Sequence, residues 1–178
     1  VMTFNIKSAV RGLDRVAEVI RSARPDIVAL QEVDHSSRRS KGLDQTAALA
    51  KRTGLAHGTH FRTTDLRGGG YGIALLSRFP LESPVQRPLP VPRGAEPRTV
   101  AHALVRVAGR EVSVYATHLI PQALPAIEPG GWRRVPTASD EGVIVAGDSS
   151  DASIQGALQS GVDAAARVVA RLQGGPTR

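Results

Sequence analysis

The chain has 178 residues, which is enough for one domain with a buried core and too few for two, so we predict a single domain over 1–178. Its formal net charge is +7, carried mostly by arginine, and this favours an anionic partner such as a phosphate ester or nucleic acid. An arginine-rich composition inherited from a GC-rich genome would explain the charge equally well. The absence of cysteine excludes disulfides, thiol nucleophiles and thiolate zinc sites.

No segment is long and apolar enough to be a transmembrane span. The first residues, VMTFNI, have the pattern of a β-strand and not of a signal peptide, so none is expected in the sequence shown. The cytoplasm of a bacterial cell and secretion from it both remain open. We expect a monomer.

Strands and helices alternate in the first third of the chain, which favours layers of helix against sheet. Strands are expected at 1–6 and 26–31, and helices at 13–23 and 44–54. The first helix places Val16, Val19 and Ile20 on one face. The strand at 26–31 has an unbroken apolar run, which is typical of a strand buried on both sides.

The middle of the chain is predicted to be β-rich. A strand is expected at 71–79, a proline-rich loop at 80–97, and a hairpin at 98–119 that turns at Ala108-Gly109. His57 and His60 are interpreted as surface residues of a loop that leads into a strand. Three further interpretations concern the rest of the chain: a strand at 143–148, a loop at 120–142 because of its prolines, and a helix at 160–175.

Four of the expected strands end on a residue that can bind a metal, a phosphate or a proton. These residues are Asn5, Glu32, His118 and Asp148. Carboxylate and amide oxygens are hard ligands that suit Mg²⁺ or Mn²⁺. Each residue alone is more simply explained as a turn or structural residue, so the prediction of a site depends on the set.

Five segments in order resemble the endonuclease/exonuclease/phosphatase superfamily of metal-dependent phosphoesterases. They are MTFNIK, RPDIVALQEVD, YGIALLSRFPL, EPRTVAHALVRVAGREVSVYATHL and VIVAGDSSD, and they cover residues 1 to about 151. The resemblance implies an α/β fold in which two mixed sheets form a sandwich flanked by helices, a four-layer α/β/β/α arrangement.

The resemblance also implies roles for the four strand-end residues. Glu32 matches the principal Mg²⁺ ligand, and Asn5 matches the amide that organises metal and phosphate. His118 matches the histidine that contacts the scissile phosphate, and Asp148 matches the aspartate that orients or deprotonates the attacking water. Phosphoryl transfer needs such positioning and charge neutralisation.

Three more residues are expected to contact substrate or phosphate. Arg98 and Tyr71 occupy family positions near the site, and Ser150 stands where the family has an asparagine. A serine hydroxyl reaches less far than an amide, which predicts a weakened site unless Asp151 compensates. The basic residues Arg38, Arg39 and Lys41 are interpreted as a solvated loop, or as a grip on the phosphate of a nucleic acid or lipid headgroup.

The family ends in a Ser-Asp-His element, and no Asp-His pair follows Asp148 in this sequence. The expected fold therefore lacks its C-terminal strands, and its activity is expected to be impaired. The function predicted is Mg²⁺- or Mn²⁺-dependent hydrolysis of a phosphodiester or phosphomonoester, of the nuclease or the lipid or inositol type. The alternatives are an inactive anion- or nucleic-acid-binding remnant of the fold, and a fragment of an active enzyme.

Overall fold

A computed structural model describes residues 1–119 and the backbone of residues 142–146. Several expectations lie outside these residues: the loop at 120–142 apart from its last position, the helix at 160–175, and the site residues Asp148 and Ser150. The single domain over 1–178 likewise stays a prediction.

Two four-stranded sheets make up the described fold, in the orders β1-β2-β4-β3 and β5-β6-β7-β8. The first contains β1 (Met2–Asn5), β2 (Ile27–His35), β3 (His57–Leu66) and β4 (Gly69–Ser77). The second contains β5 (Glu82–Leu89), β6 (Arg98–Val107), β7 (Arg110–Thr117) and β8 (Gly142–Ala146). Both sheets are mixed, because β1–β2 and β7–β8 are parallel and the other neighbours are antiparallel.

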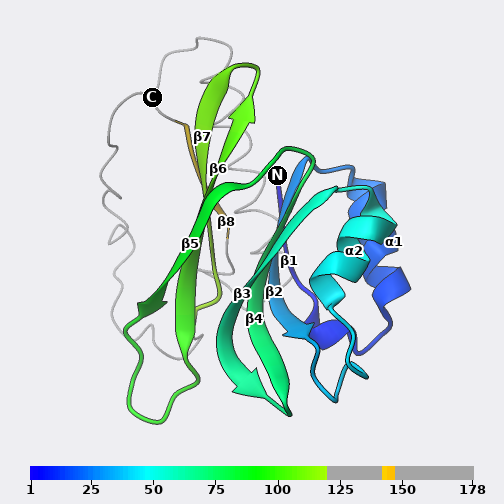
Figure 1. Cartoon of the computed structure of the whole chain (residues 1–178), viewed down its shortest axis with the longest axis vertical. Helices are drawn as coiled ribbons and strands as arrows, with labels where there is room; N and C mark the ends of the chain where they lie inside the picture. Colours follow the sequence, from blue (N-terminus) through cyan, green and yellow to red (C-terminus); the bar gives the residue numbers. More distant parts are fainter. Residues whose placement is uncertain (120–141, 147–178) are drawn as a thin grey trace, which may run out of the picture.

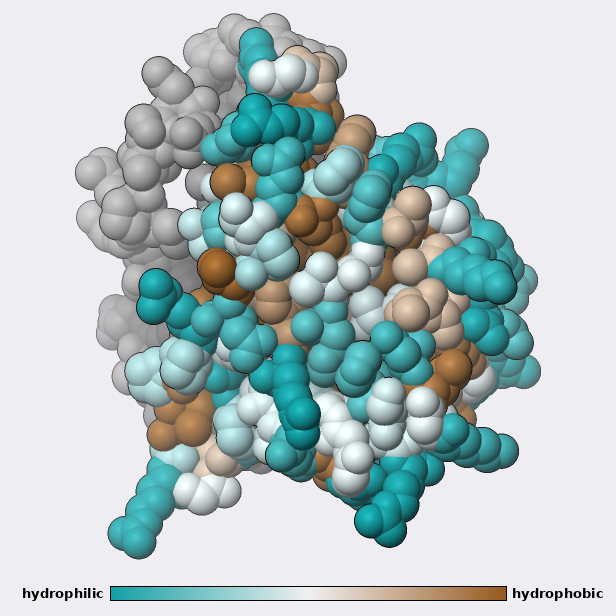
Figure 2. Space-filling view, viewed as in Figure 1, coloured by the Kyte–Doolittle hydropathy of each residue, from teal (hydrophilic) through white to brown (hydrophobic). Residues whose placement is uncertain are grey.

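The helices α1 (Leu13–Ala23) and α2 (Gln45–Thr53) lie on the side of the first sheet that faces away from the second, as Figure 1 shows. A single 3₁₀ turn, η1 (Lys7–Ala9), follows β1. This arrangement confirms the predicted two-sheet α/β sandwich. In Figure 2, hydrophilic residues predominate along the helical side, and the described residues leave few large apolar side chains exposed: Val10, Val19, Leu43 and Val85.

Two apolar clusters explain why β2 begins with an unbroken apolar run from Ile27 to Leu30. Ile27 and Ala29 belong to the cluster between the two sheets, and Val28 and Leu30 belong to the cluster beneath the helices. Alternate residues of a strand point to opposite faces, so a strand covered on both faces needs an unbroken apolar run. The prediction that this strand is buried on both sides is therefore confirmed.

The helix at 13–23 has the predicted bounds but a different buried face. Val16, Ala17 and Ile20 are buried, whereas Val19 is 46% exposed, so the face predicted to contain Val16, Val19 and Ile20 is only partly buried. Ala17 packs there because its small side chain lets the helix approach the sheet. The helix ends at Arg24, which adopts a left-handed conformation before Pro25.

The proline-rich segment 80–97 is not a loop throughout, because residues 82–89 form β5. Pro84 lies where the register with β6 shifts, and Pro88 is opposite Thr99. β5 is at the edge of its sheet. An edge strand tolerates proline because one side of it has no ladder hydrogen bonds to make, and the sequence pattern alone does not show which strand is at an edge.

The histidine interpretation also needs correction. His57 and His60 are in β3, not in a loop. The His60 ring stacks on His35 with ring centroids 5.1 Å apart, and His60 Nε2 lies 3.3 Å from the Val33 carbonyl oxygen. Burial of His60 lowers its pKa. Neighbouring strands thus partly bury His60, which the sequence indicated to be a surface residue.

The hairpin prediction is confirmed at its turn. β6 and β7 pair with Val107 opposite Arg110, and Ala108 and Gly109 both have positive φ, at 50° and 76°. Two positive φ angles are typical of the tight turn that matches strand twist. None of the described helices is long and apolar enough to cross a membrane.

Candidate functional site

Glu32 lies at a β-bulge in the middle of β2, not at the end of the strand. The register between β2 and β4 shifts between Gln31 and Val33, and Glu32 between them has a φ of 56°. A non-glycine residue pays about 1–2 kcal/mol for this left-handed conformation, and such strain concentrates at functional sites. The bulge removes Glu32 from the ladder and leaves its side chain 28% exposed.

Asn5 holds one oxygen of the Glu32 carboxylate. Its amide Nδ2 donates to Glu32 Oε1 at 2.9 Å, and its Oδ1 accepts from the backbone N–H of Lys7 at 3.0 Å. Parallel pairing of β1 with β2, with Asn5 opposite Gln31, brings the two side chains to adjacent positions. Asn5 therefore acts on Glu32 in this structure by orienting its carboxylate.

His118 approaches the same carboxylate from the second sheet. It follows the last residue of β7, and its Nε2 is 4.0 Å from Glu32 Oε1. The His118 side chain is 13% exposed. Glu32 and His118 are 27 and 113 positions away from Asn5 along the chain. The three residues meet because the ends of β1 and β7 and the bulge of β2 face the same edge of the sandwich.

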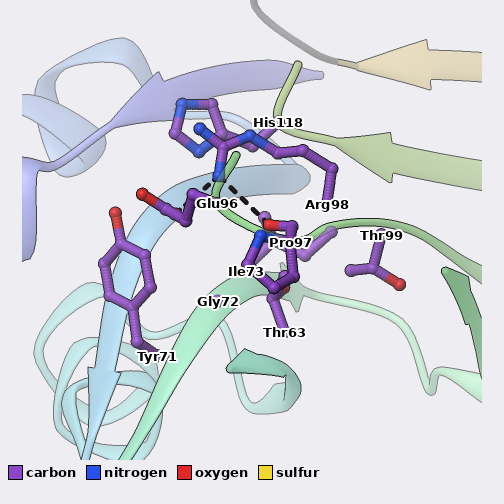
Figure 3. A pocket seen from close by; sticks show the side chains of 9 residues that line it. All are labelled: Thr63, Tyr71, Gly72, Ile73, Glu96, Pro97, Arg98, Thr99 and His118. Carbon is purple, nitrogen blue, oxygen red and sulfur yellow. Dashed lines mark hydrogen bonds and ion pairs between the residues drawn. The ribbon is translucent and has the colours of Figure 1, made fainter. Parts of the chain in front are cut away.

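A small pocket beside this cluster contains Tyr71 and Arg98. Its lining also includes Thr63, Glu96 and His118. Figure 3 shows the Tyr71 ring, the Glu96 side chain and the Arg98 guanidinium converging on it. The pKa of the Tyr71 hydroxyl is raised, first by burial and then by the negative charges of Glu32 and Glu96, so Tyr71 is a hydrogen-bond donor at neutral pH.

Arg98 is the buried cation of the pocket. Its side chain is 10% exposed, and its Nη1 donates to Glu96 Oε1 at 2.5 Å and to the Pro97 carbonyl at 3.1 Å. Its Nε is buried and has no hydrogen-bond partner among the described residues. Glu96 was not among the residues predicted from the sequence, and its only signal there is its position two residues before Arg98.

A second arginine, Arg39, lies near Tyr71 and pairs with Asp34. Its Nε and Nη2 donate to the two oxygens of Asp34 at 3.0 and 2.6 Å, and Nη2 also donates to Ser8 Oγ at 2.6 Å. Its guanidinium carbon is 5.5 Å from the centre of the Tyr71 ring. The pKa of Arg39 is raised, chiefly by the hydrogen bonds to Asp34.

Arg38, Arg39 and Lys41 lie in turns and are exposed, as the solvated-loop interpretation predicts, but the Arg39 guanidinium also pairs with Asp34. Asp34 is completely buried. A buried carboxylate needs a paired cation, and this need is the signal that could have singled out Arg39 five residues further on.

The Arg39 network also holds the turn that follows Asn5. Lys7, Ser8 and Ala9 have consecutive positive φ angles of 47°, 52° and 52°. Gln45 Nε2 donates to the Ser8 carbonyl at 2.9 Å, next to the Arg39 contact with the Ser8 hydroxyl. Three strained residues in a row persist only where surrounding contacts hold them.

Of the predicted site residues, the structure brings five together: Asn5, Glu32, Tyr71, Arg98 and His118. Asp148 and Ser150 are outside the described residues. β8 is parallel to β7 with Ala146 opposite Ala116, so it runs toward the end of β7 that leads to His118.

The donors of this cluster fit a hard divalent cation in their chemistry. The Glu32 carboxylate is partly exposed and is held by Asn5, and oxygen donors of this kind suit Mg²⁺ or Mn²⁺. In the part of the chain that the structure describes, no group of three or more acidic or histidine side chains is placed to hold a metal ion.

A model of the Endonuclease/Exonuclease/phosphatase family matches residues 2–148. The chain belongs to the endonuclease/exonuclease/phosphatase family. The cluster of Asn5, Glu32 and His118 lies within the matched residues.

Solved structures of this family resemble the chain in fold. An endonuclease/exonuclease/phosphatase from Beutenbergia cavernae DSM 12333 is 33% identical with a TM-score of 0.58, over 66% of this chain. The chain covers only 37% of that protein. A family protein from Leptotrichia buccalis C-1013-b is 15% identical with a TM-score of 0.61, over 96% of this chain and 73% of that one.

A third structure, sphingomyelinase C from Streptomyces griseocarneus, is 19% identical with a TM-score of 0.55, over 89% of this chain and 68% of that one. At this identity the likeness shows the fold alone. No curated protein sequence matches the chain significantly.

Proposed function

We propose that this chain carries the metal-binding and phosphate-binding part of a divalent-metal-dependent phosphoric ester hydrolase. The observation that carries the proposal is the meeting of Asn5, Glu32 and His118, which come from both sheets, beside a pocket with a buried arginine. Membership of the endonuclease/exonuclease/phosphatase family supports it.

Glu32 would hold Mg²⁺ or Mn²⁺, with Asn5 fixing the orientation of its carboxylate. When bound, such an ion supplies positive charge to the phosphate oxygens and favours ionisation of water. The bulge and the Asn5 hydrogen bond set the direction of Glu32 before any ligand arrives, so little reorganisation is needed on binding.

The remaining residues act on the phosphate group. His118 donates a hydrogen bond to a phosphate oxygen as negative charge develops, and Arg98 contributes a buried positive charge. The Tyr71 hydroxyl stays protonated at neutral pH and acts as a hydrogen-bond donor. Asp148 orients or deprotonates the attacking water in this proposal, and Ser150 contacts the phosphate.

Nucleic acid and lipid headgroups are both proposed substrate classes, because each contains a phosphodiester. Two proteins of similar fold represent them: sphingomyelinase C and a D. rerio TDP2 complexed with a single-strand DNA product, which has a TM-score of 0.53 and 17% identity. The net charge of +7 suits either anion.

Hydrolysis of bis(4-nitrophenyl) phosphate with Mg²⁺ or Mn²⁺, and with a chelator, tests the proposal. We expect turnover that requires the metal and is abolished in Glu32→Gln, because the amide keeps the shape of the side chain but removes its charge. Glu82→Gln is the matched control, since Glu82 is an exposed glutamate that contacts Arg106.

Turnover that survives chelation, or that survives Glu32→Gln, would contradict the proposal. Absence of turnover together with salt-sensitive DNA binding would instead support the non-catalytic remnant. Plasmid DNA and sphingomyelin vesicles, offered separately, distinguish the two substrate classes.

A further inference from the structure

The pairing of Glu96 with Arg98 differs from an ordinary surface ion pair in where its two partners lie. The Arg98 side chain is 10% exposed, whereas the Glu96 side chain is 45% exposed. Among the described residues, Glu96 makes no other hydrogen bond or ion pair than the 2.5 Å contact with Arg98 Nη1. The arginine is therefore fixed in the pocket, and the carboxylate is held only by the arginine.

Arg98 has hydrogen-bonding capacity that its present contacts do not use. Within the described part of the chain its Nε is buried without a hydrogen-bond partner, although a guanidinium presents five N–H donors in one plane. That plane matches the spacing of two oxygens of a phosphate group, which is why arginine commonly binds phosphate with two parallel hydrogen bonds. The Glu96 carboxylate now takes one of these places.

The charges around the pocket favour a ligand of low negative charge. Among the described residues, Arg39 is already paired with Asp34, the pocket lining contains one arginine, Arg98, and one carboxylate, Glu96, and the Glu32 carboxylate lies beside the pocket near His118. A phosphodiester carries one negative charge, whereas a phosphomonoester is mostly dianionic at pH 8 because its second pKa is about 6. The Glu96 carboxylate therefore repels a dianionic phosphomonoester more strongly than a monoanionic phosphodiester.

We propose that Glu96 is a specificity-determining residue of this pocket, and that its ligand is a monoanionic phosphodiester. The Glu96 carboxylate occupies the position on Arg98 that a phosphate oxygen takes on binding, and it disfavours dianionic phosphomonoesters more strongly than diesters. On binding, the exposed Glu96 side chain turns to solvent and Arg98 exchanges a carboxylate oxygen for a phosphate oxygen. This inference rests on the proposed function and narrows its substrate class.

Binding of two small phosphate esters in a chelator, at pH 8, tests the inference without any turnover. The ligands are 4-nitrophenyl phosphate, the monoester, and bis(4-nitrophenyl) phosphate, the diester, titrated into the full chain and followed by NMR. In Glu96→Gln we expect monoester affinity to rise about tenfold, equivalent to ~1.4 kcal/mol, and diester affinity to rise about threefold.

Two further variants serve as references. Glu82→Gln also removes one exposed, arginine-paired glutamate, and we expect it to leave both affinities unchanged. Arg98→Gln should weaken both ligands about tenfold or more, because it removes the cation that both are expected to contact. Circular dichroism of each variant checks that the fold is retained.

The direction of the affinity change in Glu96→Gln decides whether the inference holds. Weaker binding would show that Glu96 holds Arg98 in place for the ligand, and would overturn the inference. Equal changes for both ligands, a similar change in Glu82→Gln, unchanged affinity in Arg98→Gln, or no binding by any variant would overturn it as well.

These outcomes are independent of the hydrolysis assay. The proposed function is judged by metal-dependent turnover and by Glu32→Gln. It can fail while the binding pattern holds, and the binding pattern can fail while turnover is observed.

Discussion

Two arginine–carboxylate pairs lie near Tyr71, and they are built in opposite ways. In one, the carboxylate of Asp34 is completely buried and Arg39, 33% exposed, reaches inward to it with two hydrogen bonds. In the other, Arg98 is the buried partner and Glu96 is the exposed one. A buried carboxylate cannot change partners without leaving an uncompensated charge, whereas an exposed one can turn to water. The first pair is suited to holding the fold, and the second to exchanging ligands.

Breaking the inner pair should have the largest effect of any change at this site. Arg39→Gln leaves the Asp34 carboxylate buried without a cation, which typically costs about 3–5 kcal/mol. It also removes the contact that supports the strained turn at Ser8. We expect urea unfolding to show a loss of this size in the free energy of unfolding.

The control for that measurement is Arg52→Gln. Arg52 contacts Asp14 at 2.8 Å, but Asp14 is 90% exposed, so the expected loss is about 0–1 kcal/mol. Comparable losses in the two variants would contradict the distinction between buried and exposed carboxylates.

Tyr71, which lies near both pairs, should make a moderate contribution to the free energy of unfolding, and this contribution should depend on pH. The pKa of Tyr71 is raised above its ordinary value of about 10. The unfolded chain therefore ionises this phenol at a lower pH than the folded protein does. Its contribution to stability is fully present below pH 10 and is lost as the pH rises further.

We expect the free energy of unfolding of the wild type to fall by about 1 kcal/mol more than that of Tyr71→Phe between pH 10 and pH 11. Urea unfolding at several pH values in this range measures the difference. Identical pH dependence in the two proteins would show that the surroundings of Tyr71 do not favour its protonated form.

Removing the outer carboxylate should have the smallest effect on stability. In Glu96→Gln the lost charge is 45% exposed and the amide oxygen can still accept a hydrogen bond from Arg98, so the expected change in the free energy of unfolding is below about 1 kcal/mol. Thermal unfolding beside the wild type measures it. A loss as large as that of Arg39→Gln would mean that Glu96 is structural, and the comparison between the pairs would no longer hold.

The sequence predicted much of this site because its residues follow strong strand patterns. The apolar run at 27–30 correctly indicated a buried strand, and the polar residues after it indicated that Glu32 ends this strand, whereas Glu32 lies at a bulge within β2 beside Asn5. The helix bounds followed from periodicity and from Pro25, and the turn at Ala108-Gly109 followed from the hairpin pattern. These features depend on neighbours close in sequence.

Other features could not be predicted because they depend on residues far apart along the chain. β5 tolerates its prolines only because it is at the edge of a sheet. His60 is partly buried because its ring stacks on His35, 25 positions earlier. The bulge at Glu32 is visible only once β2 is paired with β4.

By itself, the sequence determined which side chains are available to the site: a carboxylate, an amide, a histidine and two arginines around one tyrosine. Only the tertiary structure decided that one arginine pairs with a buried carboxylate and the other with an exposed one. Packing of the first sheet buries Asp34 and commits Arg39 to it, whereas Arg98 is buried with a partner that remains at the surface. Burial sets the cost of separating two charges, and burial is a property of the folded chain and not of either residue.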